Sequence, residues 1–195
     1  VPNDPSATSI DRRVGIVMSG GSDLDIKADN IFINANEMAF HMASVCGDAN
    51  NKAITGVTNT AKFDADSIIL KGASGIRATV ASDSRNKIEF NGVGRTEIYA
   101  IIPSTVNETN FFGEIIGGKA VEIDYTDLTF NNDAVLAGEN LTAQGTAAGH
   151  LVNPGTQFEY WKDGYWLKAV SAGSESVLTA NKDASILSNG GYYNT

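Results

Sequence analysis

The spacing most suggestive of chemistry in this sequence is the run of glycines before Lys119. Gly113, Gly118 and Lys119 fit the G-x-x-x-x-G-K pattern of a phosphate-binding loop. Such a loop continues with Ser or Thr to hold Mg²⁺, and with a helix whose N-terminus faces the phosphates. Here the next residue is Ala120, and residues 121–125 alternate between apolar and polar side chains, which is typical of a strand. We therefore expect a glycine-rich turn between strands and no nucleotide binding.

Two other groupings could support catalysis or metal binding. His41 precedes Cys46 by five positions, which puts the two side chains on opposite faces of a continuous strand. The pairs Asp23/Asp25 and Asp64/Asp66 each place two carboxylates on one strand face, which predicts a solvated face. A Ca²⁺ site or a glycoside-cleaving pair is the alternative. Because the sequence has no His-x-His or Cys-rich spacing, we expect a protein without catalytic residues, cofactor or metal.

Aromatic residues gather near the C-terminus. In the segment Phe158–Leu167, Asp163-Gly164 predicts the tight turn of a hairpin between two aromatic strands. Alternate side chains of a hairpin face the core and the outside. The four candidates for an outward receptor contact are Tyr160, Trp161, Tyr165 and Trp166. Core packing or a subunit contact is the alternative role for these residues.

The composition limits the class of protein. The chain has 195 residues, of which 42% are hydrophobic and 19% charged, and this favours one domain or two small ones. Its formal net charge of −9 argues against a phosphate-mediated grip on nucleic acid. The sequence contains no apolar run long enough for a membrane helix, and residues 1–13 do not resemble a signal peptide. We therefore expect no nucleic acid partner and no membrane insertion.

An alternating apolar triplet recurs every seven residues between Leu24 and Met42. The triplets are Leu24/Ile26/Ala28, Ile31/Ile33/Ala35 and Met38/Phe40/Met42. A coiled-coil seam would leave the middle residue of each triplet on the wrong face, whereas short strands use all nine residues. We therefore predict strands with corners at 29–30 and 36–37, continued by looser alternating pieces over residues 63–92. Strands this short must stack in a solenoid or intertwine with other chains.

These patterns predict an all-β fold in three parts. Residues 1–22 are expected to form an N-terminal arm, residues 23–97 a repeat-rich β shaft, and residues 98–195 a compact antiparallel β head. The shaft is expected to be short-stranded, β-helix-like and intertwined as a trimer.

The repeats resemble those of a known class of protein. Leu24–Ala35 and Phe63–Gly72 resemble the shaft repeats of phage tail spikes and their secretion-system relatives, in which three chains wrap into a triangular β-helix. The head, with Phe158–Leu167, resembles the C-terminal β domains of virion fibres, and Val135–Leu141 is similar to capsid decoration proteins. The resemblance implies a non-enzymatic structural protein on the virion surface of a phage: a homotrimeric spike, a fibre or a capsid decoration.

Residue roles follow from this expectation. Arg12 and Arg13 are candidates for attachment to other virion proteins, either capsid or tail. The alternative functions are a module that binds a receptor or host surface glycan, and a polysaccharide-degrading tail spike. The expected trimer core consists of Leu24, Ile26, Ile31, Ile33, Met38, Phe40, Phe63, Ile68, Leu70, Ile76, Val80, Ile88 and Phe90.

Overall fold

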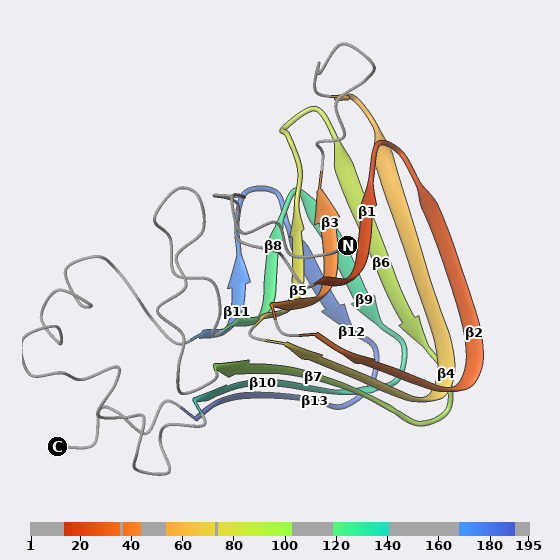
Figure 1. Ribbon diagram of the computed structural model, residues 1–195, viewed down its shortest axis with the longest axis vertical. Coiled ribbons are helices and arrows are strands. Elements are labelled where there is room, and N and C mark those ends of the chain that lie inside the picture. The colour runs from red at the N-terminus through yellow and green to blue at the C-terminus, as the bar shows by residue number, and fades with distance from the viewer. Residues whose placement is uncertain are drawn as a thin grey trace, which may run out of the picture.

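The regular elements of the described chain are all β-strands (Figure 1). The computed structural model describes residues 14–35, 37–43, 54–72, 74–102, 119–140 and 168–189. The strands are β1 (Val14–Ser19), β2 (Asp23–Asn34), β3 (Met38–Ala43), β4 (Thr58–Gly72), β5 (Ser74–Thr79), β6 (Arg85–Asn91), β7 (Arg95–Ile102), β8 (Lys119–Asp124), β9 (Thr126–Phe130), β10 (Asp133–Asn140), β11 (Lys168–Ala172), β12 (Val177–Ala180) and β13 (Ala184–Asn189).

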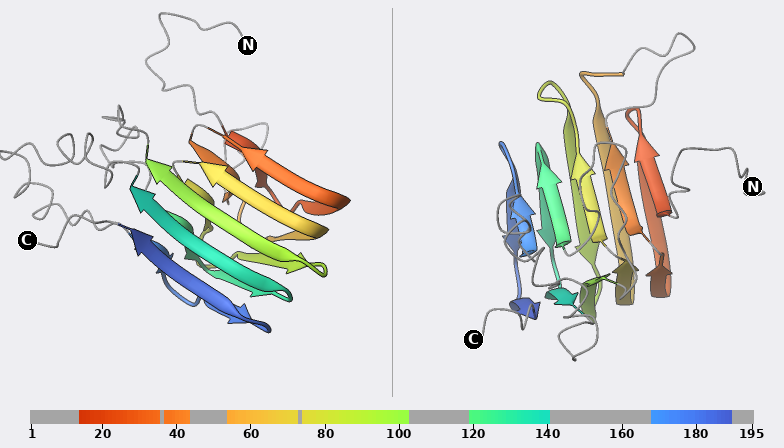
Figure 2. Two further views of the ribbon diagram at one scale, coloured as in Figure 1. Left: turned by 90° about the horizontal axis from the view of Figure 1, so that it is seen from below. Right: turned by 60° about the vertical axis from the view of Figure 1, so that its left-hand side comes forward.

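Every strand pair within the described residues is parallel and formed inside this one chain. One sheet has the order β1-β3-β5-β8-β11. The other has the order β12-β9-β6-β4-β7-β10-β13, with β2 paired to β4. Each strand therefore pairs with the strands that come one circuit earlier and one circuit later in the chain. Figure 2 shows this as a stack of layers that follow one another in chain order, from red to blue.

The chain passes through five circuits, each with three sides. Circuit 1 contains β1 and β2, and circuit 2 contains β3 and β4. Circuits 3, 4 and 5 contain β5–β7, β8–β10 and β11–β13. The first side of each circuit belongs to the five-stranded sheet, and the second and third sides belong to the eight-stranded sheet. Because β2 and β4 bend from the second side to the third, they make that sheet continuous (Figure 1).

The seven-residue repeat corresponds to the sides of this circuit. Residues 24–28 lie on the second side, residues 31–35 on the third, and residues 38–42 on the first side of the next circuit. The predicted strands are confirmed, and the coiled-coil alternative is wrong. The corner expected at 29–30 lies within β2, which bends there without ending, because neighbouring β4 bends at the same level and keeps pairing with it.

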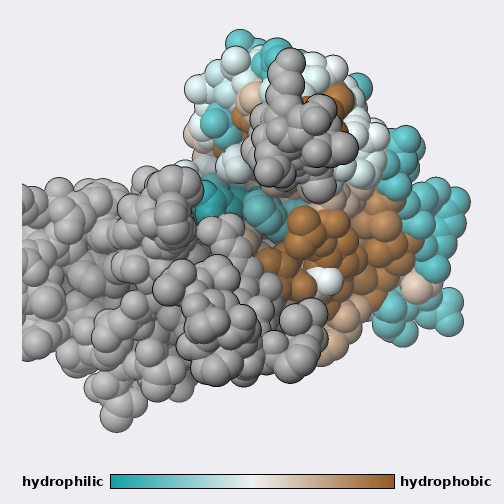
Figure 3. Space-filling view, turned by 45° about the horizontal axis from the view of Figure 1, so that its top comes forward, coloured by the Kyte–Doolittle hydropathy of each residue, from teal (hydrophilic) through white to brown (hydrophobic). Residues whose placement is uncertain are grey.

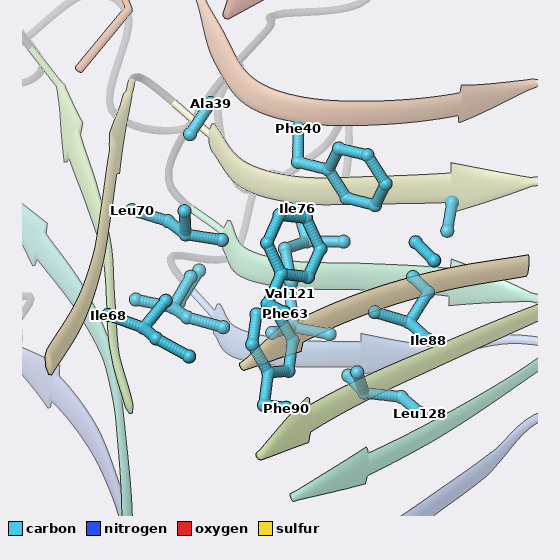
Figure 4. Packing of buried hydrophobic residues seen from close by; sticks show 14 of the residues in the cluster. Ala39, Phe40, Phe63, Ile68, Leu70, Ile76, Ile88, Phe90, Val121 and Leu128 are labelled. Atoms are coloured by element: carbon cyan, nitrogen blue, oxygen red, sulfur yellow. The ribbon is translucent and has the colours of Figure 1, made fainter. Parts of the chain in front are cut away.

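The core is built from columns of side chains that stack from circuit to circuit. In the second side, Phe63, Phe90 and Phe130 stack face to face with ring centroids 5.0 and 5.2 Å apart, and Phe40 packs edge-on against Phe63 at 5.2 Å. Figure 4 shows the labelled aromatic and aliphatic side chains pointing into the space between the sheets. Each buried aromatic ring contributes a large apolar area, so this column is a main source of stability.

A buried polar ladder lines the first corner, between the first and second sides. Asn59 donates from Nδ2 to Oδ1 of Asn86 at 2.9 Å, and Asn86 donates to the Thr126 hydroxyl at 3.3 Å. Asn59 Oδ1 accepts hydrogen bonds from the backbone N–H groups of Gly21 and Ser22. The Asn59, Asn86 and Thr126 side chains are fully buried. Each hydrogen bond of the ladder therefore takes the place of a hydrogen bond to water in the unfolded chain.

A second polar ladder lines the next corner, between the second and third sides, but on the outside. Asn131 donates from Nδ2 to Oδ1 of Asn91, and Asn181 donates in the same way to Asn131, both at 2.7 Å. Asn91 and Asn131 are half-buried and Asn181 is exposed. Both ladders therefore join three successive circuits, one in the interior and one at the surface.

The head expected for residues 98–195 is not antiparallel in its described part. β8 to β13 pair in parallel, and β8 continues the sheet of β5 while β10 continues that of β7. The alternation that indicates strands in residues 119–130 is confirmed by β8 and β9. Alternation does not specify strand direction, because both kinds of sheet place successive side chains on opposite faces.

Candidate functional surfaces

The residues expected to form a trimer core lie in the interior of a single chain. The buried members are Ile31, Met38, Phe40, Phe63, Ile68, Leu70, Ile76, Val80, Ile88 and Phe90, while Leu24, Ile26 and Ile33 are partly buried. The structure brings all but Met38 and Val80 into one hydrophobic cluster or into contact with it. The burial of the ten buried members is completed by the stacked circuits of one chain, so these ten give no physical reason for three chains to intertwine.

Several expected sites lie outside the described residues. These are Arg12 and Arg13, the aromatic residues Tyr160, Trp161, Tyr165 and Trp166, and the hairpin turn at 163–164. The glycines of the phosphate-loop pattern and Cys46 also lie outside. Of that pattern, Lys119 begins strand β8 and donates to Glu122 at 2.5 Å.

The aspartate pairs occupy outer strand faces as predicted. Asp23 and Asp25 are exposed on β2, and Asp64 and Asp66 are exposed on β4, where the alternating residues Phe63 and Ala65 are buried. Within the described ranges, no group of His, Cys, Asp or Glu side chains is arranged to hold a metal ion. The same part of the chain contains no helix that is long and apolar enough to cross a membrane.

Ion pairs on the outer faces connect successive circuits. Arg85 of circuit 3 contacts Asp127 of circuit 4 at 2.6 Å and Glu175 of circuit 5 at 3.9 Å. The hydrogen bonds that Arg85 donates to Asp127, together with the negative charge of Asp127, raise the pKa of the Arg85 guanidinium above its ordinary value. On the first side, Arg77 lies 3.4 Å from Glu122 in the next circuit. These pairs are partly exposed, so they align the circuits more than they stabilise them.

The connection before β6 contains a second electrostatic contact between circuits. A hydrogen bond from the Thr55 side chain, with smaller contributions from the Gly56 backbone and Ser84, lowers the pKa of the Asp83 carboxyl below 3.8. Ser84 also lies 3.3 Å from the Val57 backbone N–H, which donates to its hydroxyl. Hydrogen bonds to an exposed carboxylate thus join two connections that are distant in sequence.

The outer face of the third side carries one compact polar group in circuits 2 and 3. Glu97 accepts hydrogen bonds from Arg95 Nε at 2.9 Å and from the Tyr99 hydroxyl at 2.8 Å. The Lys71 ammonium lies 5.2 Å from the centre of the Tyr99 ring, within the range of a cation–π contact. In circuit 1, the residue paired with Lys71 is Asn34, and Phe32, which pairs with Ile69 beside Glu97, is 62% exposed. A face that combines charge, a hydroxyl and an exposed ring can contact a polar partner, a sugar included.

Both ends of the stack carry exposed apolar side chains. At the circuit 1 end, Ile16, Leu24, Ile26 and Ile33 belong to the core columns but are only partly buried. Figure 3 shows a wide apolar area there, next to a hydrophilic edge. At the circuit 5 end, Val177, Ile186 and Leu187 are about half exposed or more. Large contiguous apolar surface on a folded protein usually marks a contact with another protein.

Sequence reasoning missed both polar ladders and both ends. The ladders escape a search for a fixed repeat because their members are unevenly spaced along the chain, at Asn59, Asn86 and Thr126. The sequence signal is a polar residue two positions before the first inward apolar residue of the second side, as in Asn59 and Ala61 or Asn86 and Ile88. The ends could not be recognised before the order of the circuits was known.

Comparison of the chain with protein-family models, with curated proteins and with solved structures finds no match.

Proposed function

We propose that this protein is a non-enzymatic structural protein of a phage virion surface, in which a β-helical stack forms the stiff part of a spike, fibre or capsid decoration. The observation that carries the proposal is the continuity of the core along the stacking axis. The phenylalanine column, both asparagine ladders and the ion pairs of Arg85 all run from circuit to circuit. Interactions that join each circuit to the next resist bending and stretching of the stack, which the stiff shaft of a spike or fibre requires.

The experiment locates the protein on particles. Antibodies raised against it are applied to virions and to host cells from the same culture, and the label is counted by electron microscopy. We expect label at the virion surface, at the tail or capsid. Label on cells alone would overturn the virion assignment. Deletion of residues 1–13, which leaves β1 in place, tests the attachment role of Arg12 and Arg13, since the truncated protein should no longer sediment with particles that lack the protein.

The homotrimer is the second part of the proposal. Because the apolar columns are filled within one chain, a trimer has to use the outer faces of the stack. Size exclusion with light scattering should give three times the chain mass of 20.6 kDa at the lowest concentration measured. A constant mass of one chain would overturn the trimer and leave the virion assignment untouched.

A receptor- or glycan-binding module is the second candidate function, and the lengths of the connections favour it. Residue 73 alone joins β4 to β5, whereas residues 141–167 join the equivalent strands β10 and β11. The longer connection contains Trp161 and Trp166. Glycan-array binding that is lost in Trp161→Ala or Trp166→Ala and retained in Val93→Ala would support this role. Turnover of a bound polysaccharide would instead indicate a degrading tail spike.

A further inference from the structure

The two ends of the stack carry matching side chains. Six inward-facing columns begin in circuit 1 and finish in circuit 5 with an apolar residue at both ends. The terminal pairs are Ile16 and Val170, Met18 and Ala172, Leu24 and Leu178, Ile26 and Ala180, Ile31 and Ala184, and Ile33 and Ile186. A circuit 1 placed after a circuit 5 would therefore continue each column with another apolar residue.

The backbone at the two ends matches as well. Among the described strands, β1 and β2 each pair with one neighbour, on the circuit 2 side, and β11, β12 and β13 each pair with one neighbour, on the circuit 4 side. All pairs are parallel, so a second copy in the same orientation would meet β11 to β13 with strands running in the matching direction. Open sheet edges of this kind pair readily with another chain.

Residues 1–13 are poorly suited to cover the circuit 1 end. Residues 1–13 include Pro2 and Pro5, and their other apolar residues are Val1, Ala7 and Ile10. Three such side chains are too few for six apolar columns, and proline cannot donate to a strand ladder. A second copy of the chain supplies all six columns at the correct spacing.

We propose that copies of this protein stack head to tail, with circuit 1 of one copy on circuit 5 of the next. The proposal rests on the structural function above and gives the way in which such a shaft would lengthen. Because the two contacting surfaces differ, the interface is heterologous and leaves a free end after each addition. The assembly therefore grows with concentration.

A cysteine pair tests the arrangement with little disturbance of the fold. Ile33 and Ile186 end the same column, so in the stacked assembly the two residues occupy neighbouring strands about 4.8 Å apart. This spacing lies within the range that a disulfide spans. In a Cys46→Ser background, Ile33→Cys and Ile186→Cys are made separately, then mixed under mild oxidation and analysed on a non-reducing gel.

We expect the disulfide-linked dimer only in the mixture. A dimer from Ile33→Cys alone would show that two circuit 1 ends meet symmetrically, and it would overturn the proposal. Absence of any link in the mixture would also overturn it. If links then form once residues 1–13 are deleted, the occupant of the circuit 1 end is this segment rather than a second copy.

Charged variants give an independent measure by mass. Ile186→Asp and Ile33→Asp should each be unable to extend beyond one copy, while an equimolar mixture should form a dimer and stop there, because one intact end of each kind remains. Val93→Asp is the matched control, since Val93 is 90% exposed on a corner away from both ends. It should keep the concentration-dependent growth.

Folding of each variant is checked by circular dichroism. If Ile33→Asp does not fold, Ile186→Asp alone decides, because Ile186 is 57% exposed and its substitution spares the core. Growth of Ile186→Asp equal to that of the unaltered protein would overturn the proposal. A protein that does not stack can still label virions, so this proposal and the proposed function fail separately.

Discussion

The two polar ladders use hydrogen-bonded asparagine side chains at two corners of the stack, but in opposite surroundings. Asn59, Asn86 and Thr126 are fully buried at the first corner, whereas Asn91 and Asn131 are half-buried and Asn181 is exposed at the second. At the first corner, no water can replace a lost partner. At the second, water can bond to any amide whose neighbour is removed.

The difference shows that a ladder's contribution to stability depends on burial rather than on its hydrogen bonds alone. The bonds of the outer ladder are the shorter ones, at 2.7 Å against 2.9 and 3.3 Å for the inner ladder. Even so, the inner ladder should have the larger effect on the free energy of unfolding. Removing one of its members leaves a buried polar group without a partner.

The largest loss of stability is expected at Phe90, which lies between the two corners. Phe90→Ala removes the middle ring of the stacked column and should lower the free energy of unfolding by about 3–5 kcal/mol, through lost burial and a cavity. Urea denaturation measures the change. Phe32→Ala is the control, because the Phe32 ring is mostly exposed, and it should cost less than about 1 kcal/mol. Equal losses would show that the phenylalanine column is not the main source of stability.

The next effect is expected at the inner ladder. Asn86→Leu keeps the size of the side chain but leaves Asn59 Nδ2 without its acceptor in a buried corner. We expect a loss of about 2–3 kcal/mol in the free energy of unfolding. Thermal and urea unfolding should agree on this value. An unchanged midpoint would mean that water reaches the first corner.

A smaller effect is expected at the outer ladder, from the same substitution. Asn131→Leu removes the hydrogen bonds to Asn91 and Asn181 where water can replace them. The expected loss is below about 1 kcal/mol. The comparison with Asn86→Leu, measured under identical conditions, tests the difference between the corners directly. A loss at Asn131 as large as that at Asn86 would contradict the burial argument.

The smallest effect is expected at Asp83, next to the first corner, and it should depend on pH. Hydrogen bonding lowers the pKa of the Asp83 carboxyl in the folded protein below 3.8, so its ionised form stabilises the fold above that pH. The contribution is lost as the pH falls through the lowered pKa. The difference in Tm between the unaltered protein and Asp83→Asn should therefore be present at neutral pH and shrink below 3.8.

The sequence predicted the strands well and their partners poorly. The triplet around Ile33 identifies strand faces because a period of two distinguishes inward from outward side chains. It does not identify partners, which lie a whole circuit away: Ile33 pairs with Leu70, and Phe90 with Phe130. Circuit lengths vary along the chain, so no fixed repeat indicates this pairing. The apolar triplets were assigned to a trimer core for the same reason, because their partners within the chain could not be identified from the sequence.

The candidate surfaces were harder to predict than the strands. Asp23 and Asp25 could be placed on an outer face from alternation alone. The group formed by Lys71, Glu97 and Tyr99 required two circuits to be set in register, and the apolar ends required the order of all five. Both features depend on the topology of the chain. The local sequence pattern indicates only which residues face inward and which face outward.

The pairing of each circuit with the one before it also has a kinetic consequence. Val14 pairs with Met38, Phe40 with Ile76 and Ile76 with Val121, so no strand waits for a partner more than one circuit downstream. A chain leaving the ribosome can therefore fold from its N-terminal circuit onward, each finished layer acting as the template for the next. Synthesis and folding would then advance in the same direction and nearly in step.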